Sequence, residues 1–393
     1  MGTASFEGFG LRMVVASDKF KGTLTSAEVA EAVGVGVQRV CPDATVISVP
    51  VADGGDGTLS AAVAAGYTLF PVAASGPTGE PVRSGYARLG DTAVVELADV
   101  SGLVRLPDDR PAPLTATSYG TGEVIAAAVD AGCTRIILGI GGSASTDGGR
   151  GMISALAGEP HPHSGNNSAL GDEKLPETGA SLAALRGRLE GVRVVVACDV
   201  DNPLTGPRGA AAVYGPQKGA TPEQVVRLDA ALTEWADLVA RETGRDLRDV
   251  PGAGAAGGVG FAAIALLGAE LRPGIDLVLE MVRFGEKVAG ADLVVTGEGA
   301  LDEQTLHGKA VAGVAAAAVG STAGGLPVVA VCGVNKLAPE QLKGIGVAAA
   351  YALTDIEPDV RRCIAEPRPL LEALGERIAV EHLTMTRREK GIA

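Results

Sequence analysis

Three short glycine-rich segments of this chain carry acidic side chains, and each follows an apolar run. A glycine-rich turn between a strand and a helix lets backbone N–H groups approach an anion. Carboxylates in the same turn would repel that anion unless a metal ion lay between them. One such segment alone is compatible with an ordinary strand-to-helix turn, but three together indicate a site for a metal ion and phosphate groups. The segments are 53–58 (DGGDGT), 139–149 (GIGGSASTDGG) and 296–302 (TGEGALD).

Lysine, a residue that could meet such an anion, is scarce in the chain. Four of the nine lysines stand in turn-like segments that contain glycine. A lysine in a loop is usually a solvated surface charge, but one that follows a strand beside glycine is a candidate for a phosphate or carboxylate contact. The four are Lys19, Lys21, Lys218 and Lys309.

The charge balance makes local cations important. The formal net charge is −14, and so acidic a chain is a poor partner for nucleic acid. The same field repels an anionic substrate, so positive groups must lie at the site itself. Met1–Gly10 lacks a signal-peptide pattern and no long apolar run without charge follows. We therefore expect a cytoplasmic protein without a membrane helix.

The cysteines and histidines do not predict a metal centre. The five cysteines are widely spaced, form no Cys-x-x-Cys pair and indicate no disulfide framework. His161 and His163 stand in a polar stretch, which favours a solvated loop. We therefore expect no structural zinc site.

Both ends of the chain predict strands that alternate with helices. Thr25 and Glu28 have the spacing of a capping box, which begins a helix that ends near Val40. Strand–helix alternation predicts parallel sheets with right-handed crossovers. The expected strands are 13–16, 46–51, 292–295, 327–332 and 347–353, and the further expected helices are 58–65, 309–319, 339–343 and 369–385.

The middle of the chain is less regular. Thr221 and Gln224 form a second capping box around a first-turn proline, which predicts a helix to about Glu242, ended by Gly244. Trp235 recurs with leucines at helical spacing, so we expect it in the core. The expected strands are 93–97, 135–140 and 192–197, and the expected loops are 158–180 and 244–258.

Two common nucleotide-binding motifs do not fit. A Walker loop needs G-x-x-x-x-G-K-[ST], but Gly308-Lys309 is followed by alanine and lacks the first glycine. A G-x-G-x-x-G match at 252–257 follows a polar run instead of a strand, and the better placed 139–144 segment lies in mid-chain. These departures favour a kinase without a Walker loop over a nicotinamide-dependent dehydrogenase.

An ordered set of segments is similar to one enzyme family. The segments are 17–22 (SDKFKG), 51–58 (VADGGDGT), 117–123 (TSYGTGE), 141–149 (GGSASTDGG), 198–204 (CDVDNPL), 215–220 (GPQKGA), 252–258 (GAGAAGG), 272–274 (RPG) and 296–299 (TGEG), with Asp302, Gln304, Thr305, Gly308 and Lys309. From about Met13 to Leu374 the chain resembles the glycerate kinase family, a group of ATP-dependent kinases without a Walker loop. The clearest departure is 158–178, which is polar here.

The resemblance implies an α/β fold of two α/β domains. Residues 13–70 and 275–393 would form a discontinuous Rossmann-like domain from both chain ends, and 71–274 an inserted central α/β domain. Residues 1–12 would be an N-terminal extension. The active site is then expected in the cleft between the domains.

The resemblance also implies transfer of the γ-phosphoryl group of ATP to a hydroxyl of D-glycerate, with the 2- and 3-hydroxyl groups both open. ATP and Mg²⁺ are the expected cofactors, because phosphoryl transfer depends on positioning and on charge neutralisation by a metal ion and cations. Small molecules are the expected partners, and the oligomeric state stays open.

The expected roles fall on ten residues. The catalytic candidates are Lys19, Asp199 and Asp302, and the D-glycerate candidates are Lys19, Lys21 and Asp53. The candidates for ATP phosphates are Gly141, Gly142, Ser143 and Lys309, and those for the metal ion are Asp53, Asp199 and Glu298. Asp201, which precedes Asn and Pro, is expected to be a turn residue.

Two other interpretations stay open. A non-catalytic binding or sensor protein for an acidic metabolite would share the glycine turns but would not need acids at three of them. A nicotinamide-dependent dehydrogenase would need its fingerprint at the start of a sheet. ATP consumption in the presence of D-glycerate separates all three interpretations.

Overall fold

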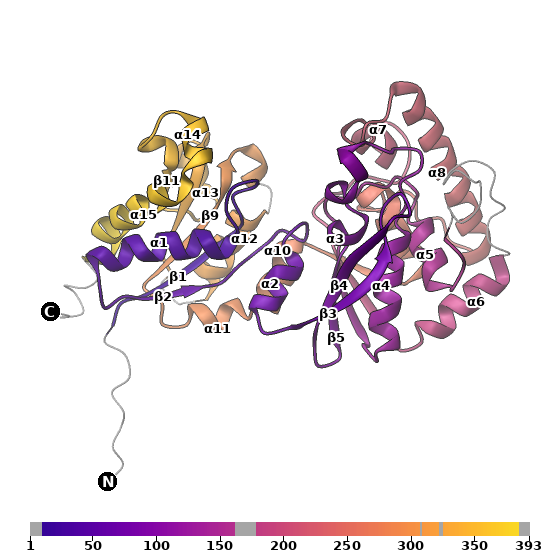
Figure 1. Cartoon of the computed structure of the whole chain (residues 1–393), viewed down its shortest axis with the longest axis horizontal. Helices are drawn as coiled ribbons and strands as arrows, with labels where there is room; N and C mark the ends of the chain where they lie inside the picture. The colour runs from indigo at the N-terminus through magenta and orange to yellow at the C-terminus, as the bar shows by residue number, and fades with distance from the viewer. Residues whose placement is uncertain (1–9, 162–177, 307–308, 322–324, 385–393) are drawn as a thin grey trace, which may run out of the picture. The chain divides into compact units, whose positions relative to one another are not determined.

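The computed structural model describes residues 10–161, 178–306, 309–321 and 325–384 (Figure 1). It is an α/β structure with two sheets rich in parallel strands, which confirms the expected fold class. Contacts divide the chain into two compact units, one with the residues up to Ala52 and from Val278 onward, the other with Asp53–Leu277. The domain boundaries expected at 70/71 and 274/275 stay a prediction. Outside the described residues lie 1–9 of the expected extension, His163, Gly308 and most of the expected 158–180 loop.

The first unit has a sheet of five parallel strands in the spatial order β2-β1-β9-β10-β11. Numbered along the chain within the unit, this order is 2-1-3-4-5, that of a doubly wound sheet. Ligands of such sheets bind outside the carboxyl ends of the strands where the order reverses, here β1 and β9. The strands are β1 (Arg12–Ser17), β2 (Thr45–Ser48), β9 (Leu293–Leu301), β10 (Val328–Asn335) and β11 (Ala349–Ala352).

Two long helices of this unit pack closely against each other. The expected capping box begins α1, with the Glu28 N–H donating to the Thr25 hydroxyl at 3.3 Å. Gly36 on α1 and Gly375 on α15 allow the approach, because a Cβ on either would overlap the backbone of the other helix. The helices are α1 (Ser26–Val40), α11 (Phe284–Val288), α12 (Ala310–Gly320), α13 (Pro339–Gly344), α14 (Val360–Ala365) and α15 (Pro367–Ile378), and α10 (Gly274–Met281) contains the division between the units.

The second unit has a mixed sheet in the order β3-β4-β5-β6-β7-β8. β3, β4 and β5 are antiparallel neighbours, whereas β5 to β8 run parallel, so the carboxyl ends of these four meet at one edge. The strands are β3 (Thr68–Ser75), β4 (Pro81–Leu89), β5 (Thr92–Glu96), β6 (Arg135–Gly139), β7 (Arg193–Ala197) and β8 (Glu270–Arg272). The helices are α2 (Thr58–Ala64), α3 (Ala98–Ser101), α4 (Tyr119–Asp130), α5 (Arg150–Leu156), α6 (Thr178–Arg188), α7 (Ala210–Tyr214), α8 (Pro222–Thr243) and α9 (Val259–Leu266).

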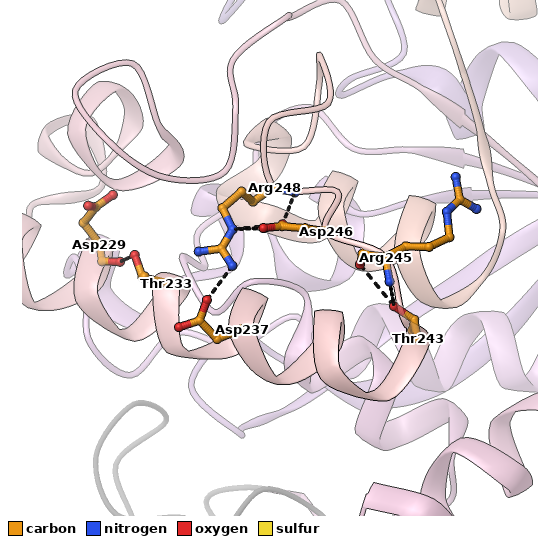
Figure 2. A network of polar contacts seen from close by, with 7 residues as sticks. All are labelled: Asp229, Thr233, Asp237, Thr243, Arg245, Asp246 and Arg248. Carbon is orange, nitrogen blue, oxygen red and sulfur yellow. Dashed lines mark hydrogen bonds and ion pairs between the residues drawn. The ribbon is translucent and has the colours of Figure 1, made fainter.

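Helix α8 confirms the expectations for the middle of the chain. Its capping box is present, and Gly244 ends it in the left-handed conformation. Trp235 is buried, and its indole N–H donates to the Gly148 carbonyl at 3.0 Å. After the helix, Arg248 pairs with Asp246 and with Asp237 of α8 (Figure 2). The residues before Gly252 are therefore a polar anchor on α8 and not a strand, which removes the context that a dinucleotide fingerprint needs.

The segment 296–302 differs from its expected conformation. Through Leu301 it is not a turn but the second half of β9, with Glu298 opposite Cys332 and Leu301 opposite Asn335 of β10. Glycines weaken strands, so the sequence pattern ended this strand at Val295. In the folded chain Gly297 is required there, because a Cβ would overlap the carbonyl of Val331.

Several element boundaries also differ. β2 ends at Ser48 and not at Val51, and the last helix, expected at 369–385, begins at Pro367 and gives way to a π-helical turn at Ala379–Leu383. The sequence pattern predicted neither β3, β4 and β8 nor most helices of the second unit, among them α4, α6 and α9. β3 lies at the edge of the sheet and carries mostly exposed residues and a proline, a residue that sheets accept chiefly in edge strands. Within the described residues, no helix is both long and apolar enough to cross a membrane.

Candidate active site

The first unit brings two of the predicted lysines and two of the predicted acids to the edge where its strand order reverses. Lys19 and Lys21 follow β1, Glu298 lies in β9 and Asp302 comes directly after it. β1 and β9 are adjacent and parallel. The loop after β1 lies beside Gly299, since a Cβ on that glycine would be 3.7 Å from the Lys21 backbone nitrogen. Cationic and anionic side chains thus share the ordinary ligand position of an open α/β sheet.

A hydrogen-bonded network holds the acids after β9. The Thr305 hydroxyl donates to Glu298 Oε1 at 2.5 Å and accepts the Asp302 N–H at 3.0 Å. Asp302 Oδ1 accepts the Gln304 N–H at 2.9 Å. The Lys309 ammonium, at the start of α12, donates to Gln304 Oε1 at 2.7 Å. Hydrogen bonds among the described residues therefore link Glu298 and Asp302 through Thr305, and Lys309 to the same group through Gln304.

The second unit brings the 53–58 segment onto the end of β7. Gly54 has φ +86°, and a Cβ there would lie 2.6 Å from the Ala197 Cβ. The same segment lies against the loop after β6, because a Cβ on Gly141 would be 2.6 Å from the Gly55 Cα. Only glycine permits both contacts, so these glycines are required for packing whether or not they meet a ligand.

Asp53 and Asp199 converge on one glycine. Asp199, which follows β7, accepts the Gly274 N–H through Oδ1 at 2.8 Å. A Cβ on Gly274 would overlap the Asp53 carbonyl group. The Asp53 side chain accepts the Gly55 N–H at 3.3 Å and is half-buried, whereas Asp199 is exposed. Two acids that are 146 positions apart in the sequence are therefore neighbours at the edge of this sheet.

The loop after β6 presents backbone donors. The Gly142 carbonyl accepts the Leu103 N–H at 2.9 Å, and the Ala144 N–H donates to the Ser101 carbonyl at 3.0 Å. Among the described residues, the N–H groups of Gly141, Gly142 and Ser143 find no hydrogen-bond acceptor. Polar groups left without a partner in a folded chain are suited to an external acceptor such as a phosphate oxygen.

Glu96, at the end of β5, is an ionisable group that the sequence did not single out. It is 5% exposed, and its carboxylate accepts the N–H groups of Gly57 at 3.2 Å and Leu59 at 2.8 Å. Burial raises the pKa of Glu96 to about 7, those two N–H groups oppose the shift, and the charges of Asp56 and Asp99 add to it. Glu96 therefore anchors the 53–58 segment at the start of α2. A single acidic residue at the end of an apolar strand was its only sequence signal.

Lys218, one of the four lysines in glycine-containing segments, is a second buried ionisable group of this unit. It is 2% exposed, and its ammonium donates to the Ser143 hydroxyl at 2.8 Å and to the Ser145 carbonyl at 2.5 Å. Burial lowers the pKa of Lys218 to about 7, and the charge of Asp147 opposes the shift. Lysine is almost never fully buried without paired groups, so this position is unusual.

Asp147, the acid of the 139–149 segment, lies among hydrogen-bond donors of the protein. Asp147 is 2% exposed, and its carboxylate accepts five hydrogen bonds from protein groups. The donors are the Thr117 hydroxyl, the Ser118 N–H and hydroxyl, and the N–H groups of Gly149 and Gly151. Hydrogen bonds from neutral protein groups thus stabilise the Asp147 carboxylate.

The donor set is compatible with magnesium but not with a complete protein cage. Among the described residues, no group of three or more His, Cys, Asp or Glu side chains could hold a metal ion. Mg²⁺ is usually bound by one or two carboxylates together with waters and substrate phosphates. Asp53 and Asp199 in the second unit carry carboxylate oxygens of the kind that this mode uses, and so does Glu298 in the first unit. Asp201 is exposed and pairs with Arg208 at 3.5 Å.

The chain is similar in sequence and in structure to glycerate kinases. The model of the glycerate kinase family matches residues 13–383. A glycerate kinase of Bacillus subtilis (strain 168) is 48% identical over 312 residues, which are 78% of this chain and 82% of that protein. A glycerate 2-kinase of Escherichia coli (strain K12) is 44% identical over 309 residues, which are 78% of this chain and 81% of that protein. A crystal structure assigned to glycerate kinase 2 of Salmonella typhimurium LT2 is similar with a TM-score of 0.77 and 39% identity, and covers 96% of this chain and 100% of that one.

Proposed function

The chain belongs to the glycerate kinase family, and we propose that it transfers the γ-phosphoryl group of ATP to a hydroxyl group of D-glycerate. The observation that carries the proposal is the position of Lys19, Lys21, Glu298 and Asp302 at the reversal point of a doubly wound sheet. The name of the Escherichia coli relative, a glycerate 2-kinase, supports the 2-hydroxyl as the acceptor.

Lys19 and Lys21 are proposed to bind the glycerate carboxylate. Both follow β1, Lys19 half-buried and Lys21 exposed. In a protein with a net charge of −14, a small anion needs such local cations. Asp53, whose side chain is half-buried beside the end of β7, is proposed to accept a hydrogen bond from a glycerate hydroxyl.

The loop after β6 is proposed to bind ATP phosphates. The N–H groups of Gly141, Gly142 and Ser143 find no acceptor within the described residues, as noted above. Lys309 would add a cation, and its ammonium now donates to the uncharged Gln304 amide oxygen, an acceptor that a phosphate oxygen can replace. These donors would stabilise charge that develops on the transferred group.

Asp199 and Asp302 are proposed to act on the attacking hydroxyl group. The hydroxyl oxygen forms a bond to the γ-phosphorus, the bond from that phosphorus to the β–γ bridging oxygen breaks, ADP leaves, and a carboxylate accepts the hydroxyl proton. Asp53, Asp199 and Glu298 are the proposed metal ligands. Mg²⁺, when bound, would neutralise charge on the phosphates.

The proposal is tested by adding D-glycerate, ATP and Mg²⁺ to the purified protein and following ADP release, with the products identified by ³¹P NMR. We expect ADP and 2-phosphoglycerate, and no reaction with a nicotinamide cofactor and a 2-hydroxy acid. The 3-phospho isomer would correct the acceptor atom only. A folded protein that consumes no ATP with a panel of small hydroxy acids would refute the kinase and favour a binding protein for an acidic metabolite.

A further inference from the structure

Lys218 holds an unusual position for a cation. It belongs to a short 3-10 turn, Pro216–Lys218, that precedes α8. Gly219 follows with φ +87° and packs against Pro111, where a Cβ would overlap that ring. This turn directs the Lys218 side chain inward, where its ammonium donates to the Ser143 hydroxyl and the Ser145 carbonyl.

The chemistry of the two groups fixes the direction of their hydrogen bond. An ammonium has three donors and no acceptor, whereas a hydroxyl can donate one hydrogen bond and also accept. Next to charged Lys218, Ser143 Oγ must therefore accept, and its own proton must point elsewhere. Among the described residues, the Ser143 hydroxyl makes no hydrogen bond besides the one it accepts from Lys218. Ser143 is thus prepared to donate a hydrogen bond to an external acceptor.

The position of the Ser143 side chain is fixed as well. The backbone on either side of Ser143 is tied to residues 101–103, with Gly102 opposite Ser143. Ser143 is 6% exposed and lies next to exposed Gly142. Its hydroxyl is therefore close to the backbone donors of the same loop, which are assigned above to the ATP phosphates.

A purely structural role for Lys218 explains less. Such a role would be to neutralise buried Asp147, but the Asp147 carboxylate already accepts five hydrogen bonds. The cost of burying the ammonium lowers the pKa of Lys218 to about 7. A nearby phosphate would favour the charged form and so restore the pKa. A role in ligand binding therefore explains the buried charge of Lys218 better than the neutralisation of Asp147 does.

We propose that Lys218 is a positioning residue for phosphoryl transfer, which makes the Ser143 hydroxyl a fixed hydrogen-bond donor to a phosphate oxygen of the nucleotide. The inference rests on the proposed function, because it takes the ligand of this loop to be the triphosphate of ATP. Lys218 acts through Ser143, and Ser143 makes the contact.

The test is a double-mutant cycle with Lys218→Met, Ser143→Ala and the double variant, and Lys343→Met on exposed α13 as the matched control. We expect each single variant to lower kcat/KM for ATP by about ten- to a hundredfold, the range for a hydrogen bond to a charged group. The kcat/KM of the double variant should lie within about twofold of that of the less active single variant, because all three variants lose the same interaction. The KM for D-glycerate should stay near the wild-type value in every variant, and Lys343→Met should keep wild-type kinetics. The proposal would be overturned if the losses of kcat/KM in the two single variants multiplied in the double variant. It would also be overturned if kcat/KM fell equally for ATP and for D-glycerate and the Tm fell with it.

A second measurement covers the case in which Lys218→Met does not fold. The magnesium complex of AMP-PNP, a non-hydrolysable ATP analogue, should raise the Tm of the wild type and of Ser143→Thr, which keeps the hydroxyl, but raise that of Ser143→Ala much less. Equal shifts in all three proteins would overturn the inference. The same experiment separates it from the proposed function: wild-type protein that binds AMP-PNP through Ser143 but does not phosphorylate D-glycerate would refute the reaction and keep the site.

Discussion

Asp199 Oδ1 accepts the backbone N–H of Gly274 at 2.8 Å, which ties the acid after β7 to the first residue of α10. The same glycine contacts the Asp53 carbonyl so closely that a Cβ would overlap it. The two acids proposed as metal ligands in the second unit thus share one backbone anchor. Their separation depends on the packing of the 53–58 segment on β7, which only glycine at position 54 allows.

Asp199→Asn separates the charge of this acid from its packing. The amide oxygen can still accept the Gly274 N–H, so we expect a Tm close to that of the wild type. We expect kcat to fall at least about a hundredfold, as when a general base or charge-stabilising group is lost. Extra Mg²⁺ should restore part of the rate if Asp199 is a metal ligand, and none if it accepts the proton. Asp201→Asn, at an exposed neighbour, is the control, and normal kinetics in Asp199→Asn would make Asp199 a structural residue.

Lys19→Ala tests the substrate site of the first unit. We expect kcat/KM for D-glycerate to fall by about two orders of magnitude, because the variant loses a charged contact to an anionic substrate. The free energy of unfolding should change by less than about 1 kcal/mol, as at most positions near the surface. Steady-state kinetics and urea unfolding measure both, with Lys343→Ala as the control. Near-native kinetics would show that Lys19 is an ordinary surface charge and does not bind the substrate.

Removal of the metal tests the role of the acids. We expect EDTA to abolish turnover and excess Mg²⁺ to restore it, because the proposed phosphate site has carboxylates that only a cation reconciles with ATP. Far-UV circular dichroism should not change, since the described residues contain no protein cage for a structural metal. Full activity in buffer freed of divalent metals would contradict this prediction.

Glu96→Gln should change the dependence of stability on pH. The pKa of Glu96 is about 7 in the folded protein, against 4.5 as the ordinary value. Between these values the unfolded chain releases the proton and the native protein keeps it, so this group's contribution is fully present below pH 4.5 and is lost as the pH rises to about 7. The loss is at most about 3 kcal/mol by the linkage relation.

The measurement is urea unfolding of wild type and Glu96→Gln at several pH values from 5 to 8. Glutamine keeps one acceptor oxygen but cannot ionise. The variant should therefore be less stable than the wild type at pH 5, and the difference in free energy of unfolding should shrink as the pH rises. Glu340→Gln, at an exposed position of α13, is the control, and its free energy of unfolding should depend on pH as that of the wild type does. A parallel profile for Glu96→Gln would show that Glu96 does not titrate in this range.

The sequence predicted elements best where local signals agree. Thr25 with Glu28, and Thr221 with Gln224, began their helices as expected because a capping box is decided by residues three apart. β9 was cut short because its second half is stabilised by pairing with β10, which no local pattern contains. β3 and β4 were missed for the same reason, since a hairpin at a sheet edge needs little apolar alternation.

The candidate site divides in the same way. By itself, the sequence determined the α/β class, the family resemblance and the set of lysines, acids and glycines able to handle phosphate, because residue type and order are properties of the chain. Only the tertiary structure decided which of these side chains meet. It placed Asp53 beside Asp199 through Gly274, surrounded Asp147 with hydrogen-bond donors, and buried Lys218 against Ser143. Such relations depend on contacts between distant segments and on the cost of burying charge, and neither is written in local sequence.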